Sequence, residues 1–410
     1  MPDAPFLLNT SPQVRQYLLV TGNYWAFTLT DGALRMLVVL HFHELGYNPL
    51  AIAMLFLFYE IFGAITNLIG GWLGAHMGLN KTMNIGLGIQ VFALGMLLVP
   101  ASTLTVPWVM AAQALSGIAK DLNKMSAKSS IKLLIPANAQ GTLYKWVAIL
   151  TGSKNALKGV GFFLGGTLLS LFDFIGAISI MTCALALVWI FSMFMLKEDI
   201  GKAKSKPRFT DIFSKSRAIN YLSAARLFLF GARDVWFVVA LPVFLTSNLG
   251  WDHWSVSGFI ALWIIGYGIA QIFAPLFTGV RSGKLPDGKA AFVWATALAL
   301  IPAIIATGLL NVASPEWILL GGLLIFGVLF AINSSLHSYL ILSYANDDGV
   351  SLDVGFYYMA NSVGRLIGTV LSGWLYQVAG LEACLWVSTA LITIAALISL
   401  ALPKHASDAV

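Results

Sequence analysis

Charged residues are scarce in this chain of 410 residues, and their scarcity argues against a soluble protein. Only 10% of the residues are Asp, Glu, Lys or Arg, whereas soluble domains carry about a quarter. Hydrophobic residues make up 58% and the mean hydropathy is +0.82. The composition predicts a polytopic membrane protein in a lipid bilayer. The formal net charge of +6 follows from its topology and intramembrane bases, so no nucleic-acid partner is expected.

Cysteine is almost absent. Cys183 and Cys384 are the only two, and they lie in separate apolar stretches, which is typical of packing residues. No spacing of Cys and His matches a metal-ligand motif. We therefore expect no metal site and no cofactor.

Long apolar stretches are abundant instead. Each is long enough to cross a bilayer as a helix, and together they predict an all-α membrane protein with twelve transmembrane helices. The stretches are 17–40, 50–74, 81–100, 107–134, 143–170, 175–196, 220–245, 254–279, 289–310, 317–343, 354–376 and 381–402. The first lacks a small-residue cleavage site, so we expect it to stay in the membrane.

The positive charges predict the orientation. The connections that follow odd-numbered stretches contain no Lys or Arg, whereas the opposite side is rich in both. Positive loops face the cytoplasm, so both termini are predicted to be cytoplasmic.

The polar segment between the sixth and seventh stretches divides the chain into two six-helix halves. We predict an N-terminal half at 1–196, a flexible cytoplasmic linker at 197–219 and a C-terminal half at 220–410. The halves resemble each other at an offset of about 204 residues: Asp31 corresponds to Asp234, and the run 128–132 corresponds to 333–337. Duplicated six-helix halves are a recurrent plan of transporters.

Lysines inside apolar stretches are the most informative feature of the chain. Four recur at every fourth position: Lys120, Lys124, Lys128 and Lys132. The next stretch adds Lys154 and Lys158. A charge at the bilayer centre costs roughly 2.5–3.5 kcal/mol on insertion scales, so such residues face a cavity or a partner. Snorkelling to the interface is an alternative for the two lysines nearest the cytoplasm.

Nine intramembrane bases stand against four acids, Asp31, Glu60, Asp121 and Asp234, and this surplus predicts an anionic ligand. Arginine forks also suit oxyanions, although Arg35 could simply pair with Asp31. The predicted substrate-binding residues are Lys120, Lys124, Lys154, Lys158, Arg35, Arg226, Arg233, Arg365, Tyr24, Asn123, Asn155, Tyr358 and Asn361.

Three acids are candidates for proton coupling: Asp31, Glu60 and Asp234. Glu60 has no base within a turn of its own helix, so its carboxyl group is expected to be the most free to bind a proton. A hydrogen bond between helices is the alternative role for Glu60. Transport without a coupling ion is also open, because an inside-negative potential already favours anion export.

Two other classes of function fit less well. An integral membrane enzyme acting on a phosphorylated lipid would need a His–acid pair, a metal cluster or an activated Ser or Cys, and none occurs at a suitable spacing. A channel would need a ring-forming filter. We therefore expect a carrier rather than an enzyme or a channel.

The placement of charge resembles the major facilitator superfamily, because stretches three, six, nine and twelve contain no charged residue in their interiors. The run GWLGAHMG at 71–78 is a degenerate copy of that family's loop motif, with Ala75 and His76 in place of the usual Asp and Arg. The resemblance implies two six-helix halves, with the uncharged helices facing lipid.

Longer runs resemble the organoarsenical efflux permeases called ArsJ. They are 17–47, 115–136, 150–163 and 213–244. The resemblance implies export of 1-arseno-3-phosphoglycerate across a bacterial inner membrane, as a proton antiporter, with a glyceraldehyde-3-phosphate dehydrogenase supplying the substrate. An organophosphate importer or exchanger of the same fold remains the alternative. The scarcity of Cys agrees with a pentavalent arsenate ester, since trivalent arsenic favours clustered thiolates.

Overall fold

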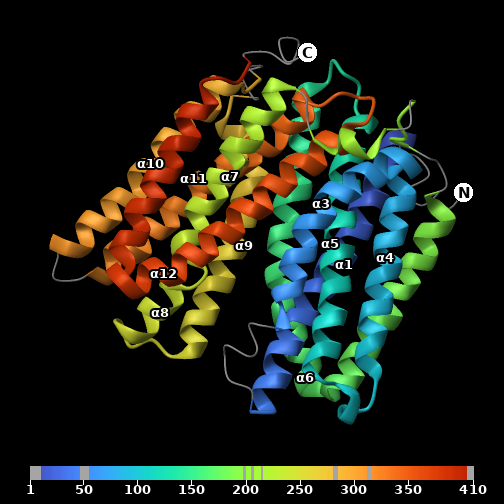
Figure 1. The fold of residues 1–410 in the computed structure, drawn as a ribbon, viewed down its shortest axis with the longest axis horizontal. Helices are drawn as coiled ribbons and strands as arrows, with labels where there is room; N and C mark the ends of the chain where they lie inside the picture. The colour runs from blue at the N-terminus through green and yellow to red at the C-terminus, as the bar shows by residue number, and fades with distance from the viewer. Residues whose placement is uncertain are drawn as a thin grey trace, which may run out of the picture. The chain divides into compact units, whose positions relative to one another are not determined.

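The computed structural model describes residues 11–46, 55–196, 200–204, 207–213, 216–279, 285–311 and 315–403. Every regular element in these ranges is a helix (Figure 1), which confirms the all-α prediction. The long helices are α1 (Pro12–Glu44), α3 (Leu57–Met77), α4 (Leu79–Gly95), α5 (Val106–Leu134), α6 (Gln140–Met195), α7 (Arg217–Phe237), α9 (His253–Phe277), α10 (Gly288–Asn311), α11 (Pro315–Tyr344) and α12 (Val350–Ser399). Shorter ones are α8 (Ala240–Ser247), η2 (Met96–Leu98), η3 (Ala101–Thr103) and η4 (Phe209–Ile212).

The helices follow the predicted apolar stretches in order. The seventh stretch is shared by α7 and α8, the fifth and sixth lie in α6, and the last two lie in α12. Residues 50–54 of the second stretch lie outside the described residues. Helices satisfy their own backbone hydrogen bonds, and this is why long apolar segments adopt them in lipid.

Both α6 and α12 consist of two helices joined at a sharp break. The break in α6 is at Asp173, with φ 55° and ψ 179°, and the break in α12 is at Gly380, with φ 76° and ψ −173°. Each break falls in the predicted connection between two stretches. The two residues adopt the same unusual backbone conformation in corresponding places of the two halves.

Seven helical segments of the described chain are long and apolar enough to cross a membrane. The three long helices outside this set are α1, α3 and α5. They carry Asp31, Arg35, Glu60 and the lysine ladder, which is Lys120, Lys124, Lys128 and Lys132. The helices that are least suited to lipid therefore hold one part of the predicted site.

A break between α7 and α8 precedes Pro242. Proline has no N–H and its ring clashes with the carbonyl four residues earlier, so α7 ends at Phe237 and α8 starts at Ala240. The backbone N–H groups of Val239 and Ala240 donate instead to the Ser372 hydroxyl of α12, at 3.4 and 3.1 Å. The chain bends here without leaving these groups unsatisfied.

The chain forms two compact units. Unit 1 comprises residues 1–146, 157–213 and 346–355, and unit 2 comprises 147–156, 214–345 and 356–410. In unit 1, glycines let α1 approach α6 closely: a Cβ on Gly32 would lie 2.8 Å from the Lys158 carbonyl oxygen. This contact places Lys158 beside the turn of α1 that carries Asp31.

The core of unit 2 is aromatic. The Trp236 ring of α7 meets Phe326 of α11 edge-on, with centroids 5.0 Å apart, and Trp263 of α9 at 6.3 Å. Trp263 in turn stacks on Tyr267 at 5.8 Å. These rings fix α7, α9 and α11 against each other and hold the polar residues of the same helices in place.

The described part of the predicted linker is bound to unit 1. The N–H of Leu79 donates to the Ile200 carbonyl at 2.8 Å, and the N–H of Ala203 donates to the Ala75 carbonyl at 2.8 Å. The Trp72 indole donates to the Pro207 carbonyl at 3.0 Å. These bonds satisfy backbone groups at the ends of α3 and α4.

Candidate substrate-binding site

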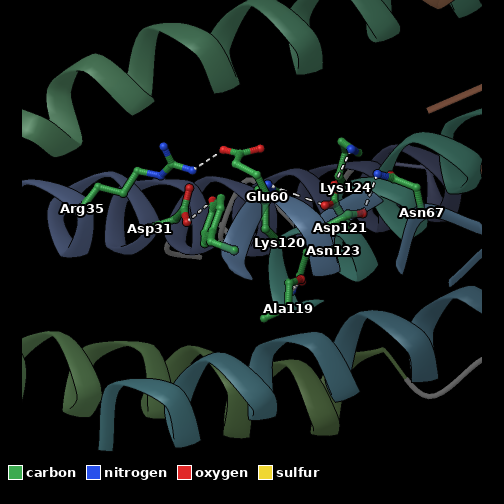
Figure 2. A network of polar contacts seen from close by, with 11 residues as sticks. Asp31, Arg35, Glu60, Asn67, Ala119, Lys120, Asp121, Asn123 and Lys124 are labelled. Carbon is green, nitrogen blue, oxygen red and sulfur yellow. Dashed lines mark hydrogen bonds and ion pairs between the residues drawn. The ribbon is translucent and has the colours of Figure 1, made fainter. Parts of the chain in front are cut away.

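Tyr59 is the centre of a polar cluster in unit 1. Its ring contacts two cations, with Arg35 Cζ 4.0 Å and Lys120 Nζ 3.9 Å from the ring centroid. Figure 2 shows both of these cations. Its hydroxyl donates to Asp31 Oδ1 at 2.6 Å. Tyr59 is fully buried, where a cation–π contact contributes about 2 kcal/mol. One ring thus orders two predicted site residues on α1 and α5.

Arg35 pairs with an acid of another helix. Its Nη2 atom lies 2.8 Å from Oε1 of Glu60 on α3. The sequence leaves a pairing of Arg35 with Asp31 open, and it gives Glu60 either a proton-carrying role or a hydrogen bond between helices. The observed contact is one between helices. The neighbours of Glu60 on its own helix do not show which base the next helix supplies.

Asp121 binds two lysines of the ladder. It forms an ion pair with Lys124, and its Oδ2 atom lies 3.6 Å from Lys120 Nζ. The carboxylate is only 1% exposed, whereas the two lysines are partly exposed. Gly63 of α3 makes room for it, since a Cβ there would lie 2.5 Å from Oδ2 of Asp121. Part of the predicted cation surplus is therefore neutralised inside unit 1.

The predicted site residues on α5 lie on two different faces of that helix. Lys120 and Lys124 lie on the side of α3, whereas Asn123 packs against α4, where a Cβ on Gly86 would lie 2.5 Å from its Nδ2. That Nδ2 atom donates to the Ala119 carbonyl at 2.9 Å (Figure 2), and Asn123 is completely buried. The structure does not bring Asn123 together with the lysines.

Unit 1 contains two further predicted residues, Tyr24 and Lys158. Tyr24 is 1% exposed on α1, and its carbonyl accepts a hydrogen bond from Thr28 at 2.7 Å. Lys158 lies against α1 through its backbone, and its Nζ atom is 5.9 Å from the Phe162 ring centroid.

Lys154 and Asn155 belong to unit 2. The Nζ atom of Lys154 lies 3.4 Å from Oδ1 of Asn155, and Asn155 donates to Gln271 of α9 at 2.5 Å. Gln271 then donates to the Tyr267 hydroxyl at 3.0 Å. This chain of amides connects a predicted substrate-binding lysine with the aromatic core of unit 2.

Asp234 holds two arginines in unit 2. It is completely buried; Arg233 lies 2.5 Å from its Oδ1 atom and Arg365 lies 3.0 Å from its Oδ2 atom. The Phe230 ring contacts two cations, with Arg226 Cζ 3.9 Å and Arg233 Cζ 5.0 Å from its centroid. In each unit, an aromatic ring therefore contacts two bases.

Arg226 completes this second cluster. It donates from Nε to Asn361 Oδ1 at 2.9 Å and from Nη1 to the Ser334 carbonyl at 3.2 Å. Tyr358 is 3% exposed on α12, next to Tyr357, with ring centroids 4.9 Å apart. The predicted residues on α7 and α12 are thus brought together within unit 2.

Sequence reasoning missed several residues of both clusters: Tyr59, Tyr267, Gln271, His337 and Tyr357. One signal was available, because Tyr267 and Gln271 are four residues apart and share a helix face. Tyr59 gave no such signal, since its partners lie on α1 and α5.

The family model described as Major Facilitator Superfamily matches the chain at residues 20–266 and 222–409. Comparison with curated proteins found no match.

Solved structures that resemble the chain are membrane transporters. A bacterial homologue of the iron transporter ferroportin, in an outward-facing state, has a TM-score of 0.74 at 13% identity, covering 94% of this chain and 98% of that one. The human organic anion transporter MFSD10 (TETRAN) has a TM-score of 0.74 at 15% identity, covering 95% and 100%. The E. coli fucose:proton symporter FucP has a TM-score of 0.70 at 12% identity, covering 95% and 99%.

Proposed function

Because the chain belongs to the major facilitator superfamily, we propose that it exports a small organic polyanion by alternating access, and that this substrate is 1-arseno-3-phosphoglycerate. The fold does not select the substrate, since its relatives carry iron, organic anions or sugars. The clusters of charged residues indicate the class of substrate.

The surplus of bases in unit 2 carries the proposal. The cluster has three arginines, Arg226, Arg233 and Arg365, and one carboxylate, Asp234. The two carboxylate oxygens bind Arg233 and Arg365. In the membrane, such a charge persists where it meets a partner or a substrate. Guanidinium forks fit the planar edges of phosphate and arsenate groups. The observed donors therefore favour a polyanion over a cationic or apolar ligand.

Unit 1 supports the same chemistry with lysines. Lys120 and Lys124 share Asp121, and each remains partly exposed. A pentavalent arsenate ester is an oxyanion that such donors bind. Trivalent arsenic would favour thiolates, but Cys384 is buried and Cys183 lies exposed on another helix. The exposure of Cys183 differs from the predicted packing role, because that side of α6 faces outward from unit 1.

The resemblance to organoarsenical efflux permeases selects the ester and the direction. It also motivates a bacterial inner-membrane location and a glyceraldehyde-3-phosphate dehydrogenase that makes the ester in the cytoplasm. An importer or exchanger of ordinary organophosphates is the second candidate, because the same bases bind phosphate and arsenate esters.

Proton coupling is assigned to Asp31 within this proposal. Glu60 and Asp234 are held by arginines, whereas the hydrogen bond that Asp31 accepts comes from the neutral Tyr59 hydroxyl. Among the described residues, Asp31 is therefore the one of the three candidate acids that forms no ion pair.

The test is uptake by inverted membrane vesicles. The ester is generated outside them from arsenate, glyceraldehyde 3-phosphate and NAD by the dehydrogenase, and arsenic in the lumen is measured. Omitting the dehydrogenase controls for arsenate alone, and arsenite is supplied in a separate arm. Accumulation only with the complete mixture supports the proposal. Uptake of 3-phosphoglycerate but not of the arsenate ester would favour the second candidate.

The double variant Cys183→Ala/Cys384→Ala extends this test. It should transport the ester at the wild-type rate, because oxyanion binding uses no thiol. Arsenite transport that disappears in the double variant would contradict the proposed substrate.

A further inference from the structure

Arg226 is a buried cation without an acidic counterpart in the part of the chain that the structure describes. It is 3% exposed, and its two hydrogen-bond acceptors, the Asn361 amide oxygen and the Ser334 carbonyl, are both neutral. Asp234 uses Oδ1 for Arg233 and Oδ2 for Arg365. A buried charge that lacks an opposite charge is costly, so Arg226 indicates a place where a negative group binds.

Three more polar side chains of unit 2 surround this arginine. Ser223 precedes it by one turn on α7, and His337 follows the Ser334 carbonyl by one turn on α11. His337 is close enough to Arg226 for the two to interact electrostatically. The Tyr357 ring of α12 lies 5.2 Å from Arg226 Cζ. Three helices therefore converge on one guanidinium.

These three side chains make no hydrogen bond to any described residue. The Ser223 hydroxyl and both ring nitrogens of His337 are buried without a partner. The Tyr357 hydroxyl is buried beside the Ser338 side chain and forms no hydrogen bond of good geometry. All three residues are at most 2% exposed. Buried polar groups are nearly always paired, so a cluster of three unpaired groups calls for a ligand.

The chemistry of this set selects an anion. A hydroxyl, a phenol, an imidazole and a guanidinium can all donate hydrogen bonds, and none of them is an acid. A metal or organic cation would be repelled by Arg226. Water could satisfy the hydroxyls and the imidazole, but it would leave the charge uncompensated. A tetrahedral oxyanion satisfies both needs.

We propose that Ser223, Arg226, His337 and Tyr357, the Arg226 cluster, bind one phosphate or arsenate group of the transported ester. The inference rests on the proposed function and adds His337 and Tyr357 as residues that determine its specificity. Donors that are buried without partners destabilise a protein. Binding of the anion removes that cost.

The experiment measures binding and thermal unfolding of the purified full chain in detergent. The probes are inorganic phosphate and 3-phosphoglycerate. His337→Leu removes both ring nitrogens at similar volume, His337→Gln keeps an N–H donor, and Tyr357→Phe removes only the hydroxyl. Tyr344→Phe is the matched control, because it removes a buried phenol that donates to the Pro403 carbonyl at 2.9 Å, outside the cluster.

We expect both His337→Leu and Tyr357→Phe to raise the Kd for both probes about 10- to 100-fold, the loss expected for a hydrogen bond to a charged group. Without ligand, these variants should unfold at the wild-type temperature or above it, because they remove unpaired groups. His337→Gln should lie nearer to the wild type, and Tyr344→Phe should bind normally.

Other results would overturn the inference. They are a wild-type protein that binds neither probe, or a His337→Leu variant that unfolds at lower temperature and binds both probes normally. If His337→Leu exports the arsenate ester at the wild-type rate, the cluster is not a substrate site although the proposed function stands. If the wild type exports no ester but binds phosphate through His337, the cluster stands and the proposed function fails.

Discussion

Arg35 and Glu60 form an ion pair between α1 and α3, with Nη2 and Oε1 2.8 Å apart, although Asp31 lies one turn from Arg35 on the same helix. Asp31 instead accepts a hydrogen bond from the Tyr59 hydroxyl. The two acids, Asp31 and Glu60, look equivalent in the sequence but have different partners in the structure. The Tyr59 ring also contacts both Arg35 and Lys120.

Replacement of Tyr59 should separate the roles of its ring and its hydroxyl. Tyr59→Leu removes two cation–π contacts, each about 1–2 kcal/mol, and should lower export at least about tenfold. Tyr59→Phe keeps both contacts and should retain more of the activity. Rates of ester uptake in inverted vesicles check this. Equal losses in the two variants would show that the hydroxyl, rather than the ring, matters.

Three lysines on α5 and α6 should be essential for transport. Lys120→Ala, Lys154→Ala and Lys158→Ala should each abolish arsenate resistance while the protein remains in the membrane, because each removes a cation near the proposed substrate path. Lys145→Ala is the matched control on α6, since Lys145 is exposed. Resistance and membrane content of the variants are measured in parallel, and wild-type resistance in all three would exclude an anion site at the lysines.

Gly63 should not tolerate a side chain. A Cβ there would lie 2.5 Å from Oδ2 of Asp121 and 3.3 Å from Lys120 Nζ, so Gly63→Ala should destabilise the protein by about 1–3 kcal/mol. Gly22→Ala, on α1 with no atom within 4 Å of the added Cβ, should be neutral or stabilising. Thermal unfolding in detergent compares the two. A stable Gly63→Ala variant would mean that Asp121 can move without cost.

Proton coupling should depend on Asp31. Asp31→Asn should make ester export independent of a pH gradient at fixed membrane potential, whereas Glu60→Gln and Asp234→Asn should lower the rate but keep the dependence on the gradient. The two latter changes leave arginines without their partners, a loss of packing and charge rather than of a proton site. If wild-type export ignores a collapsed pH gradient, no acid couples transport to protons.

Hydropathy was sufficient to predict the helices, because a chain in lipid must satisfy its backbone bonds within each helix. It also predicted where α6 and α12 break. Partners across helices could not be predicted in this way. Periodicity fixes the angle between Lys120 and Asn123 on α5, but it does not fix which side of α5 meets α3 and which meets α4. For that reason Asn123 was grouped with the lysines although it packs against Gly86.

In the candidate site, too, some residues could be predicted from the sequence and others could not. The sequence identified the charged members of both clusters, since charges stand out in apolar stretches. It missed Tyr59, because tyrosine is a common residue of membrane helices and the role of this ring depends on neighbours from other helices. Contacts between helices depend on how the helices pack, and hydropathy and periodicity do not show this.

The breaks at Asp173 and Gly380 have a consequence for engineering this protein. Their backbone region is occupied almost only by glycine, and another residue costs about 1–3 kcal/mol there. The C-terminal half meets the requirement with Gly380, while the N-terminal half keeps Asp173, whose side chain is exposed. Asp173→Gly should therefore raise the unfolding temperature without touching either cluster, and an unchanged or lower temperature would show that the aspartate is not strained. A variant that is more resistant to thermal unfolding would suit reconstitution and crystallisation.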